Sequence, residues 1–272
     1  MIQNAHFRKL RKLTGKAIGD FALIEDGDRI AVAVSGGKDS YALLHLLDEL
    51  RRRAPIHYEL VAVNIDAGFP GYRKEVLRDY LSGCGFQFHI ETADFAAVID
   101  EKRRPGSSYC SFCARLRRGV LYSVADKLGC NKIALGHHLD DFIETLLLNQ
   151  FYIGTLAAMS PKLLADNGRH TVIRPLVYVE EGEIRKLANR NGFPTIDCGC
   201  PVEGGQDQKR QRMKALVNEL HKENRFLRRS MISALANVRP RHLLDPALRR
   251  DDEHSAKSGE SRPEQVVAEK MV

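Results

Sequence analysis

The stretch RIAVAVSGGKDS, residues 29–40, places a glycine-rich turn between an apolar run and the start of a helical pattern. Residues 29–34 predict a short buried strand, because they are apolar and rich in valine and isoleucine. Leucines recur at helical spacing from about residue 40 to residue 52, so the turn is expected to lead directly into a helix. The segment therefore indicates a strand–turn–helix unit of the kind that builds α/β folds.

The turn has the chemistry of an anion-binding site. Gly36 and Gly37 allow a sharp bend that brings backbone N–H groups close to a ligand, and the following helix adds its positive dipole end. Ser35 and Ser40 supply hydroxyl donors, and Lys38 supplies a cation. The spacing matches neither the Walker loop nor the dinucleotide-binding G-x-G-x-x-G pattern. Because ligands of open α/β sheets bind at the carboxyl ends of strands, we predict a phosphate cradle here.

Strand and helix patterns alternate on both sides of this segment. The further strands are predicted at residues 58–65, 86–91 and 132–136, and the further helices at 73–83, 114–128 and 140–152. This alternation predicts parallel βαβ units in a doubly wound sheet, whose nearly all-apolar strands are covered on both faces. Residues 160–178 predict a two-strand excursion around the turn ADNGR, and residues 180–191 a charged helix.

Composition and charge limit the class of protein and indicate how the chain is divided into parts. The chain has 272 residues, 43% of them hydrophobic, and a net charge of +7. No run approaches the roughly 18 apolar residues of a membrane span, and the N-terminus has no signal-type apolar run, so we expect a cytoplasmic protein. We expect four parts along the chain: a basic helical segment (1–27, with its helix at 6–24), a nucleotide-binding domain (28–200), a basic helical region (201–244) and a disordered tail (245–272).

Four of the six cysteines form two close pairs. Cys110 and Cys113 are predicted to stand immediately before a basic helix, and Cys198 and Cys200 follow about a third of the chain later. In an intracellular protein such pairs favour metal or redox chemistry over disulfides. Three interpretations stay open: a structural zinc site on four sulfurs, a redox pair, or an iron–sulfur cluster on three cysteines. The other two cysteines, Cys84 and Cys130, are expected to be small buried residues.

The loop SGGKDS resembles the signature of the PP-loop enzymes, the N-type ATP pyrophosphatases. This resemblance implies the Rossmann-like fold of the adenine nucleotide alpha hydrolases, and a reaction that adenylates a carbonyl oxygen and releases pyrophosphate. The stretch GHHLDD, residues 136–141, resembles a second element of that family. By resemblance, ATP is bound by Ser35, Gly36, Gly37, Lys38, Asp39, Ser40, Asn64, Asp66, Gly136 and His137. The implied catalytic residues are Lys38, Asp39, Asp140 and Asp141, with Asp39 read as a magnesium ligand or a capping residue.

Three further stretches narrow the resemblance. CSFCARLRRG (110–119), ALGHHLDD (134–141) and IRPL (173–176) closely resemble the tRNA 2-thiocytidine synthetases, over residues 6 to 244. The resemblance implies ATP, Mg²⁺ and a [4Fe–4S] cluster on Cys110, Cys113 and a third cysteine. The family's C-x-x-C is here C-x-C-P followed by an insertion at 202–205, which leaves two candidates for the third ligand. Cys200 is expected, because it is nearer the position of the family's ligand, and Cys198 is the alternative.

The same resemblance implies the reaction and the partners. ATP adenylates a cytidine at position 32 of the tRNA anticodon loop, whose C2 oxygen is replaced by sulfur delivered via the cluster. A persulfide donor such as a cysteine desulfurase, and a second copy of the chain in a homodimer, are the implied protein partners. Two alternatives are a lysidine synthetase-like ligase with structural zinc and a non-catalytic nucleotide-binding module. Basic clusters are expected to guide tRNA phosphates: Arg115, Arg117, Arg118, Lys209, Arg210, Arg212, Lys214, Arg225, Arg228 and Arg229.

Overall fold

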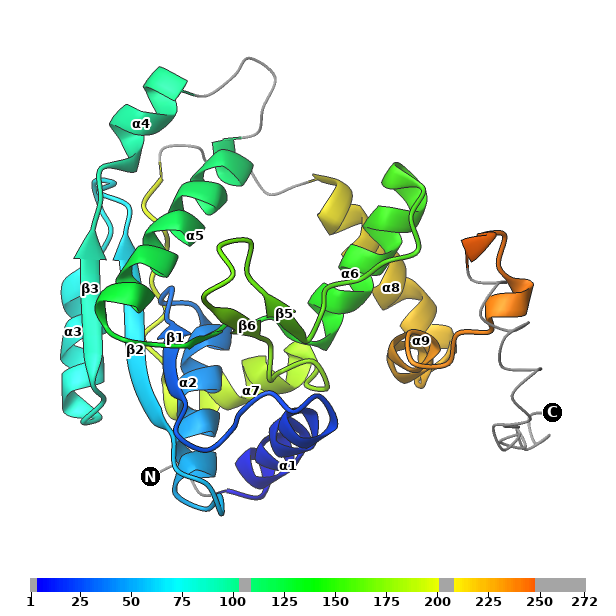
Figure 1. Ribbon diagram of the computed structural model, residues 1–272, viewed down its shortest axis with the longest axis horizontal. Coiled ribbons are helices and arrows are strands. Elements are labelled where there is room, and N and C mark those ends of the chain that lie inside the picture. Colours follow the sequence, from blue (N-terminus) through cyan, green and yellow to red (C-terminus); the bar gives the residue numbers. More distant parts are fainter. Residues whose placement is uncertain (1–3, 103–108, 201–207, 248–272) are drawn as a thin grey trace. The chain divides into compact units, whose positions relative to one another are not determined.

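The computed structural model describes residues 4–102, 109–200 and 208–247 and confirms the predicted α/β sheet. Six strands lie in the order β3-β2-β1-β4-β6-β5 (Figure 1). All neighbours are parallel except β5, which runs antiparallel to β6 at one edge. The strands are β1 (Arg29–Ala33), β2 (Glu59–Asp66), β3 (Phe88–Thr92), β4 (Lys132–Ala134), β5 (Lys162–Leu164) and β6 (Thr171–Ile173).

The strand order reverses beside the glycine-rich turn. From β1 the chain first adds β2 and β3 on one side, and it then returns to add β4 and β6 on the other side. The crossovers that follow β1 and β4 then continue to opposite sides of this position, toward β2 and toward β6. The turn after β1 and the GHHLDD stretch after β4 therefore lie side by side at the carboxyl edge of the sheet.

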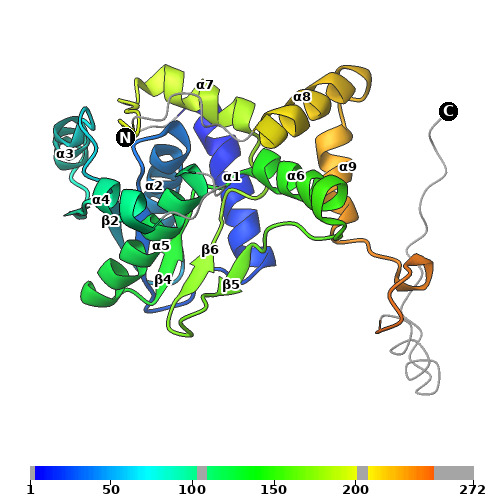
Figure 2. The same cartoon turned by 90° about the horizontal axis from the view of Figure 1, so that it is seen from above.

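Helices cover both faces of the sheet in the first 228 residues, which form one compact unit. The helices of this unit are α1 (Ala5–Asp20), α2 (Lys38–Arg51), α3 (Lys74–Gly83), α4 (Phe95–Lys102), α5 (Tyr109–Lys127), α6 (Leu139–Leu148), α7 (Glu181–Asn191) and α8 (Gln208–Glu223). Seen from above, α1, α2 and α7 lie together on one side of the sheet (Figure 2). A second unit, residues 229–272, contains the end of α9 (Leu227–Ala234) and a short 3₁₀ helix at Pro240–His242.

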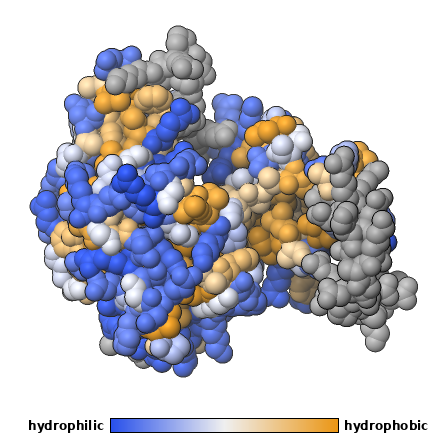
Figure 3. All heavy atoms as spheres, viewed as in Figure 1, coloured by the Kyte–Doolittle hydropathy of each residue, from blue (hydrophilic) through white to orange (hydrophobic). Residues whose placement is uncertain are grey.

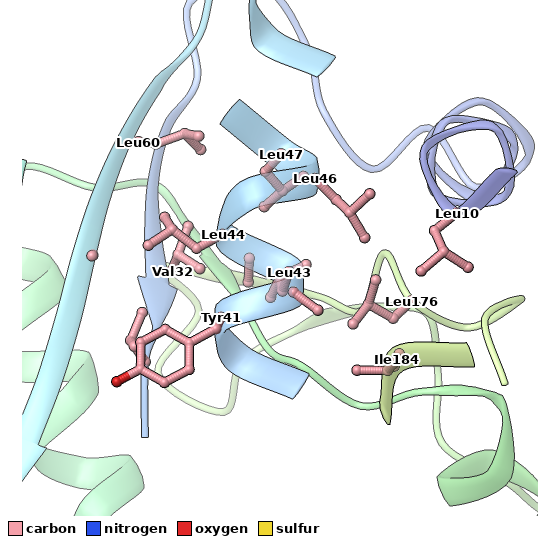
Figure 4. Packing of buried hydrophobic residues seen from close by; sticks show 14 of the residues in the cluster. Leu10, Val32, Tyr41, Leu43, Leu44, Leu46, Leu47, Leu60, Leu176 and Ile184 are labelled. Carbon is pink, nitrogen blue, oxygen red and sulfur yellow. The ribbon is translucent and has the colours of Figure 1, made fainter. Parts of the chain in front are cut away.

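Alternation along β1 divides the core into two layers. Ile30 and Val32 face the layer of α1, α2, α3 and α7, whereas Ala31 faces the layer of α4 and α5. Figure 4 shows the first layer, in which Leu10 of α1 and Ile184 of α7 approach the leucines of α2. Burying each such leucine contributes roughly 1.5–3 kcal/mol, so α2 is fixed firmly on the sheet. The position of the turn that precedes α2 is fixed with it.

Several predicted elements differ from the structure. The helix expected at 114–128 begins at Tyr109, so the first cysteine pair lies within α5 and not before it. The first helix ends at Asp20 and not near residue 24. The predicted excursion at 160–178 is a hairpin whose second strand, β6, joins the main sheet beside β4. Helix α4 was not predicted, and the edge strand β3 is only half-buried.

The C-terminal part of the chain also differs from the prediction. Within the basic helical region predicted at 201–244, the helix breaks at residues 224–226, where the Phe226 N–H donates to Asn224 Oδ1 at 2.8 Å. The expected tail lies outside the described residues from 248 on, as does the insertion at 202–205. None of the helices in the described part of the chain combines the length and apolar character needed to cross a membrane. The domain boundaries expected at 27/28, 200/201 and 244/245 stay predictions.

Candidate active site

The glycine-rich turn is held against a segment 160 residues later in the chain. Gly36 has φ +85°, a left-handed conformation that L side chains rarely adopt, and its carbonyl accepts from the Ile196 N–H at 3.0 Å. A Cβ at Gly36 would lie 2.2 Å from Cγ1 of Ile196. Only glycine fits this contact. The contact brings Cys198, two residues further along, to the phosphate cradle.

The hydroxyls of the turn fold it onto itself. Ser35 Oγ accepts from the Gly37 N–H at 3.3 Å, and Ser40 Oγ donates to the Gly37 carbonyl at 2.8 Å. Helix α2 has Gly37 as its N-cap and receives no side-chain capping bond there. Of the two roles expected for Asp39, capping is therefore wrong. The described geometry is that of a preformed turn at a helix N-terminus, which favours bound anions.

Lys38 is balanced by two carboxylates. Its Nζ lies 3.0 Å from Asp39 Oδ2 and 3.2 Å from Glu181 Oε1, and Glu181 Oε2 lies 2.7 Å from Lys214 Nζ. Burial works to lower the pKa of Lys38, but the two carboxylates outweigh it and raise that pKa. Burial likewise works to raise the pKa of Glu181, but the Lys214 hydrogen bond and the Lys38 charge lower it to about 2. At neutral pH Lys38 and Glu181 are therefore both charged.

The GHHLDD segment packs against the start of α2. A Cβ on Gly136 would lie 3.2–3.3 Å from backbone atoms of Asp39 and Ser40, so glycine permits the two loops to meet. The buried His138 has its Nε2 3.8 Å from Asp39 Oδ1. Neither Asp39 Oδ1 nor His138 Nδ1 has a hydrogen-bond partner within the described residues. Asp39 Oδ1 is thus an open acceptor at the junction of the two loops, whereas His138 Nδ1 faces Asp141 Oδ2 at 3.4 Å.

Asp140 and Asp141 are both engaged by protein groups. Asp140 Oδ2 accepts from the Glu181 N–H at 2.7 Å, and its Oδ1 accepts from Arg228 Nε at 2.7 Å. Asp141 Oδ2 accepts from the His138 N–H at 2.9 Å, at the N-terminus of α6. Both carboxylates border the site and organise its loops. Their catalytic or magnesium-binding role stays a prediction.

His137 is neutral and is oriented by an arginine. Arg174 donates from Nε to His137 Nδ1 at 3.2 Å and from a terminal nitrogen to the Ser160 carbonyl at 2.6 Å. Burial lowers the pKa of His137 to about 4 and also lowers the pKa of Arg174. Because Arg174 occupies Nδ1 as a donor, the ring proton of neutral His137 is on Nε2. His137 therefore offers a hydrogen-bond donor at its other edge.

The end of β2 lies beside the glycine-rich turn. Asn64 donates from Nδ2 to the Val34 carbonyl at 2.7 Å and to the Tyr72 hydroxyl at 2.6 Å. Its Oδ1 is buried and has no partner within the described residues, which leaves an acceptor for a ligand. Asp66 instead accepts from the Gly68 N–H at 2.9 Å and pairs with Lys74 at 3.0 Å. The structure thus brings Asn64 to the cradle and commits Asp66 to the adjoining turn.

The two cysteine pairs converge on the same side of the sheet. Cys113 is buried, whereas Cys110 and Cys198 are exposed; burial raises the pKa of the Cys113 thiol, and the nearby Cys198 and Cys110 add to that rise. Cys200 is half-buried and packs against the core layer that contains Cys113. A Cβ on Gly199, between the second pair, would lie 2.8 Å from the Tyr72 backbone nitrogen. The second pair therefore lies close to both the β2 end and the first pair.

The donors fit an iron–sulfur or zinc centre in chemical type. Burial raises the pKa of the Cys113 thiol, and the charge of Arg117 opposes that rise. Within the described residues, no three His, Cys, Asp or Glu side chains already stand at metal-binding spacing. Cys130 is buried as expected. The expectation for Cys84 is wrong, since this thiol is exposed at the end of α3.

Some residues of the site escaped the sequence reasoning. Glu181 was recognised only as the start of a charged helix, and Ile196 carried no signal. Arg210, Lys214 and Arg228 were expected to guide tRNA phosphates, and their pairing with carboxylates of the site was not foreseen. Arg210 also lies 3.7 Å from Glu144, a buried carboxyl whose pKa is raised to about 7, mainly by burial.

Comparisons with known proteins agree with this geometry. The PP-loop domain matches residues 4–197. A tRNA-cytidine(32) 2-sulfurtransferase of Syntrophotalea carbinolica is 68% identical over 92% of this chain and 96% of its own. The same-named protein of Geobacter sulfurreducens is 64% identical over 92% and 97%. The U34-tRNA thiolase NcsA from Methanococcus maripaludis, solved with its [4Fe–4S] cluster, shares the fold with a TM-score of 0.68 at 21% identity, covering 92% of this chain and 79% of its own. The chain thus belongs to the PP-loop proteins and, among them, to the tRNA-cytidine(32) 2-sulfurtransferase family.

Proposed function

We propose that this protein is an ATP-dependent tRNA thiolation enzyme that replaces the C2 oxygen of cytidine 32 with sulfur. The observation that carries the proposal is the contact of Gly36 with Ile196, which joins the phosphate cradle to the segment of Cys198 and Cys200. An activating nucleotide and a sulfur-carrying centre must act on the same carbon in such a reaction. The family membership supports both the substrate and the reaction class.

In this proposal the cradle binds ATP and assists adenylation of the base. Backbone N–H groups at the start of α2 and the Lys38 ammonium hold the phosphates, and the open acceptor of Asn64 takes a donor from the nucleotide or the base. The cytidine O2 attacks the α-phosphorus, pyrophosphate leaves, and AMP later departs with the oxygen. Lys38 offsets the charge that develops on the phosphoryl oxygens. A Mg²⁺ ion would be held by Asp39, whose Oδ1 has no partner within the described residues.

Cys110, Cys113 and Cys200 would hold the [4Fe–4S] cluster, with Cys198 as the alternative third ligand. When bound, the cluster supplies an iron position that is open to sulfur. Because Cys110 and Cys198 are exposed, a persulfide donor such as a cysteine desulfurase would be able to reach the cysteine pairs. We further propose that the protein acts in the cytoplasm as a homodimer, which light scattering at micromolar concentration would test.

The cluster and the reaction are tested together with a matched pair of cysteine variants. Anaerobically purified wild-type protein should contain iron and inorganic sulfide and be brown, whereas the zinc-bound ligase alternative would be colourless. Cys113→Ala should remove the iron and abolish 2-thiocytidine in tRNA while leaving ATP binding nearly intact. Cys130→Ala, a buried cysteine outside the site, is the control and should keep both. Retained 2-thiocytidine in a strain that carries only Cys113→Ala would refute the role of the cysteines.

Tests of pyrophosphate release separate the remaining alternative. A non-catalytic nucleotide-binding module would bind ATP without releasing pyrophosphate on addition of tRNA. We expect release to depend on tRNA that carries cytidine at position 32, and to disappear when that base is uridine-substituted. Release that is independent of tRNA would contradict the proposed substrate.

A further inference from the structure

A short loop at the far end of α6 exposes large apolar side chains. We call residues 149–157 the aromatic loop; it contains a π-helical turn, Asn149–Ile153, and the segment that follows. Phe151 is 59% exposed, Tyr152 42%, Ile153 68% and Leu156 57%. Exposed aromatic rings gathered in one loop are unusual on a folded protein and mark a binding surface. In Figure 3, apolar side chains gather over the side of the molecule formed by α6 and the segment after it.

The loop is held rigid although its side chains are exposed. Asn149 donates from Nδ2 to the Ala157 carbonyl at 2.7 Å, and its own carbonyl accepts from the N–H groups of Gly154 at 2.8 Å and Thr155 at 3.1 Å. Gly154 adopts φ +79°, which glycine allows without strain. The rings are therefore presented on a fixed backbone, so binding them costs little ordering entropy.

Charge favours a polyanion as the occupant. The Lys209 ammonium lies 4.8 Å from the centre of the Tyr152 ring, and residues 145–161 contain no aspartate or glutamate. Cores of protein–protein interfaces are depleted in lysine, whereas single-stranded nucleic acid is bound by aromatic rings beside cations. The exposed Leu163 and Leu164 on β5 would suit a second protein chain, so a second copy is the competing occupant.

The distance between the aromatic loop and the site is short enough for a tRNA anticodon loop to contact both. Helix α6 starts at the GHHLDD segment and ends where the aromatic loop begins (Figure 1). Eleven residues separate Asp140 from Phe151, which is about 17 Å at the rise of a helix. A nucleic-acid strand advances about 3.4 Å per stacked nucleotide, so about five nucleotides or fewer span this distance.

We propose that Phe151 and Tyr152 form a stacking platform for unpaired bases of the tRNA anticodon loop, with Lys209 on an adjoining phosphate. The proposal rests on the proposed function, because it assumes a tRNA substrate. Bases that neighbour the target would stack on the rings and hold the loop open while cytidine 32 enters the cradle. Each stacked base that is lost should weaken binding by about 5- to 150-fold.

The test uses leucine variants, which keep the apolar volume and remove the ring face. An anticodon stem-loop RNA with 2-aminopurine in its loop is titrated with wild type, Phe151→Leu, Tyr152→Leu, Tyr152→Phe and the control Phe226→Leu. Phe226 is an exposed ring, 43% accessible and paired with Arg225 at 4.7 Å, that lies outside the loop. We expect the quenching of 2-aminopurine fluorescence and the RNA affinity to fall in Phe151→Leu and Tyr152→Leu. Both should be retained in Tyr152→Phe and Phe226→Leu.

Each other outcome overturns the platform. Unchanged affinity in Phe151→Leu and Tyr152→Leu, or an equal loss in Phe226→Leu, would show that the loop does not stack bases. A fall in molar mass by light scattering in Phe151→Leu and Tyr152→Leu would assign the surface to a second copy of the chain. If wild type itself neither binds nor thiolates the stem-loop, the proposed function fails. If wild type does both and the leucine variants match it, only the platform fails.

Discussion

Replacing Gly36 with alanine should break the contact that joins the phosphate cradle to the second cysteine pair. Two costs add at this position. An L residue at φ +85° costs roughly 1–2 kcal/mol. The new methyl would stand 2.2 Å from Ile196 Cγ1 and 2.8 Å from its Cδ1 within the core, and overpacking of this kind costs about 1–3 kcal/mol. Together they predict a loss of about 3 kcal/mol, a large part of the stability of a typical domain.

The neighbouring glycine supplies a matched control. Gly37 has φ −86°, and a Cβ there would meet only Ser35 Oγ, at 3.4 Å, which is ordinary contact. Gly37→Ala should therefore change the free energy of unfolding by less than about 1 kcal/mol. For a domain of this size, Gly36→Ala should lower Tm by about 6–12 °C, whereas Gly37→Ala should leave it within a few degrees. For each variant, circular dichroism during urea titration measures the free energy of unfolding, and circular dichroism during heating measures Tm.

A double variant separates the two costs. Adding Ile196→Ala to Gly36→Ala removes the overlap and leaves only the backbone cost, so the two changes should be less harmful together than the sum of their separate effects. The coupling energy should be about 1–3 kcal/mol, the overpacking share. Equal stability of Gly36→Ala and Gly37→Ala, or strictly additive effects in the double variant, would refute the contact.

Three further changes test other parts of the structure. Glu181→Gln removes a carboxylate that competes with phosphate for Lys38, so ATP should bind about 5- to 10-fold more tightly by calorimetry, and weaker binding would contradict this role. The pKa of Glu144 is raised from 4.5 to about 7, so its contribution to stability is complete below pH 4.5 and is lost as pH rises through 7. This loss is at most about 3 kcal/mol, and Glu144→Gln should flatten the dependence of the urea midpoint between pH 5 and 8. Gly119 lies within α5 with open space around it, so Gly119→Ala should raise Tm by stabilising the helix by up to about 1 kcal/mol.

The sequence determined the sheet and the cradle because both depend on local patterns. Strand β1 and helix α2 follow from an apolar run and a leucine period, and the intervening glycines are required by the turn itself. Alternating strand and helix patterns then leave few topologies, since crossovers between parallel strands have one hand. The position of the GHHLDD segment after β4 follows from the same rule.

Pairings between distant charges could not be read from the sequence. Glu181 stands 143 residues from Lys38, and neither helical periodicity nor composition says which lysine a carboxylate will meet. The start of α5 was missed because Cys110 and Cys113 break the apolar pattern that marks a helix. Cys84 shows the limit of burial statistics, since its exposure is set by its place at the end of α3 and not by its chemistry.

The charge network of the site joins parts of the chain that are far apart in the sequence. The carboxylate of Glu181 pairs with two cations, Lys38 at the start of α2 and Lys214 on α8. The backbone N–H of Glu181 donates to Asp140. A phosphate that draws Lys38 away from Glu181 leaves the Glu181 carboxylate to Lys214 alone. The ion pair between Glu181 and Lys214 must then change in strength. ATP at the cradle is therefore linked, through a single side chain, to the basic helix that we expect to meet tRNA. If α8 meets tRNA as we propose, such a shared ion pair would let the nucleotide and the RNA affect each other's binding.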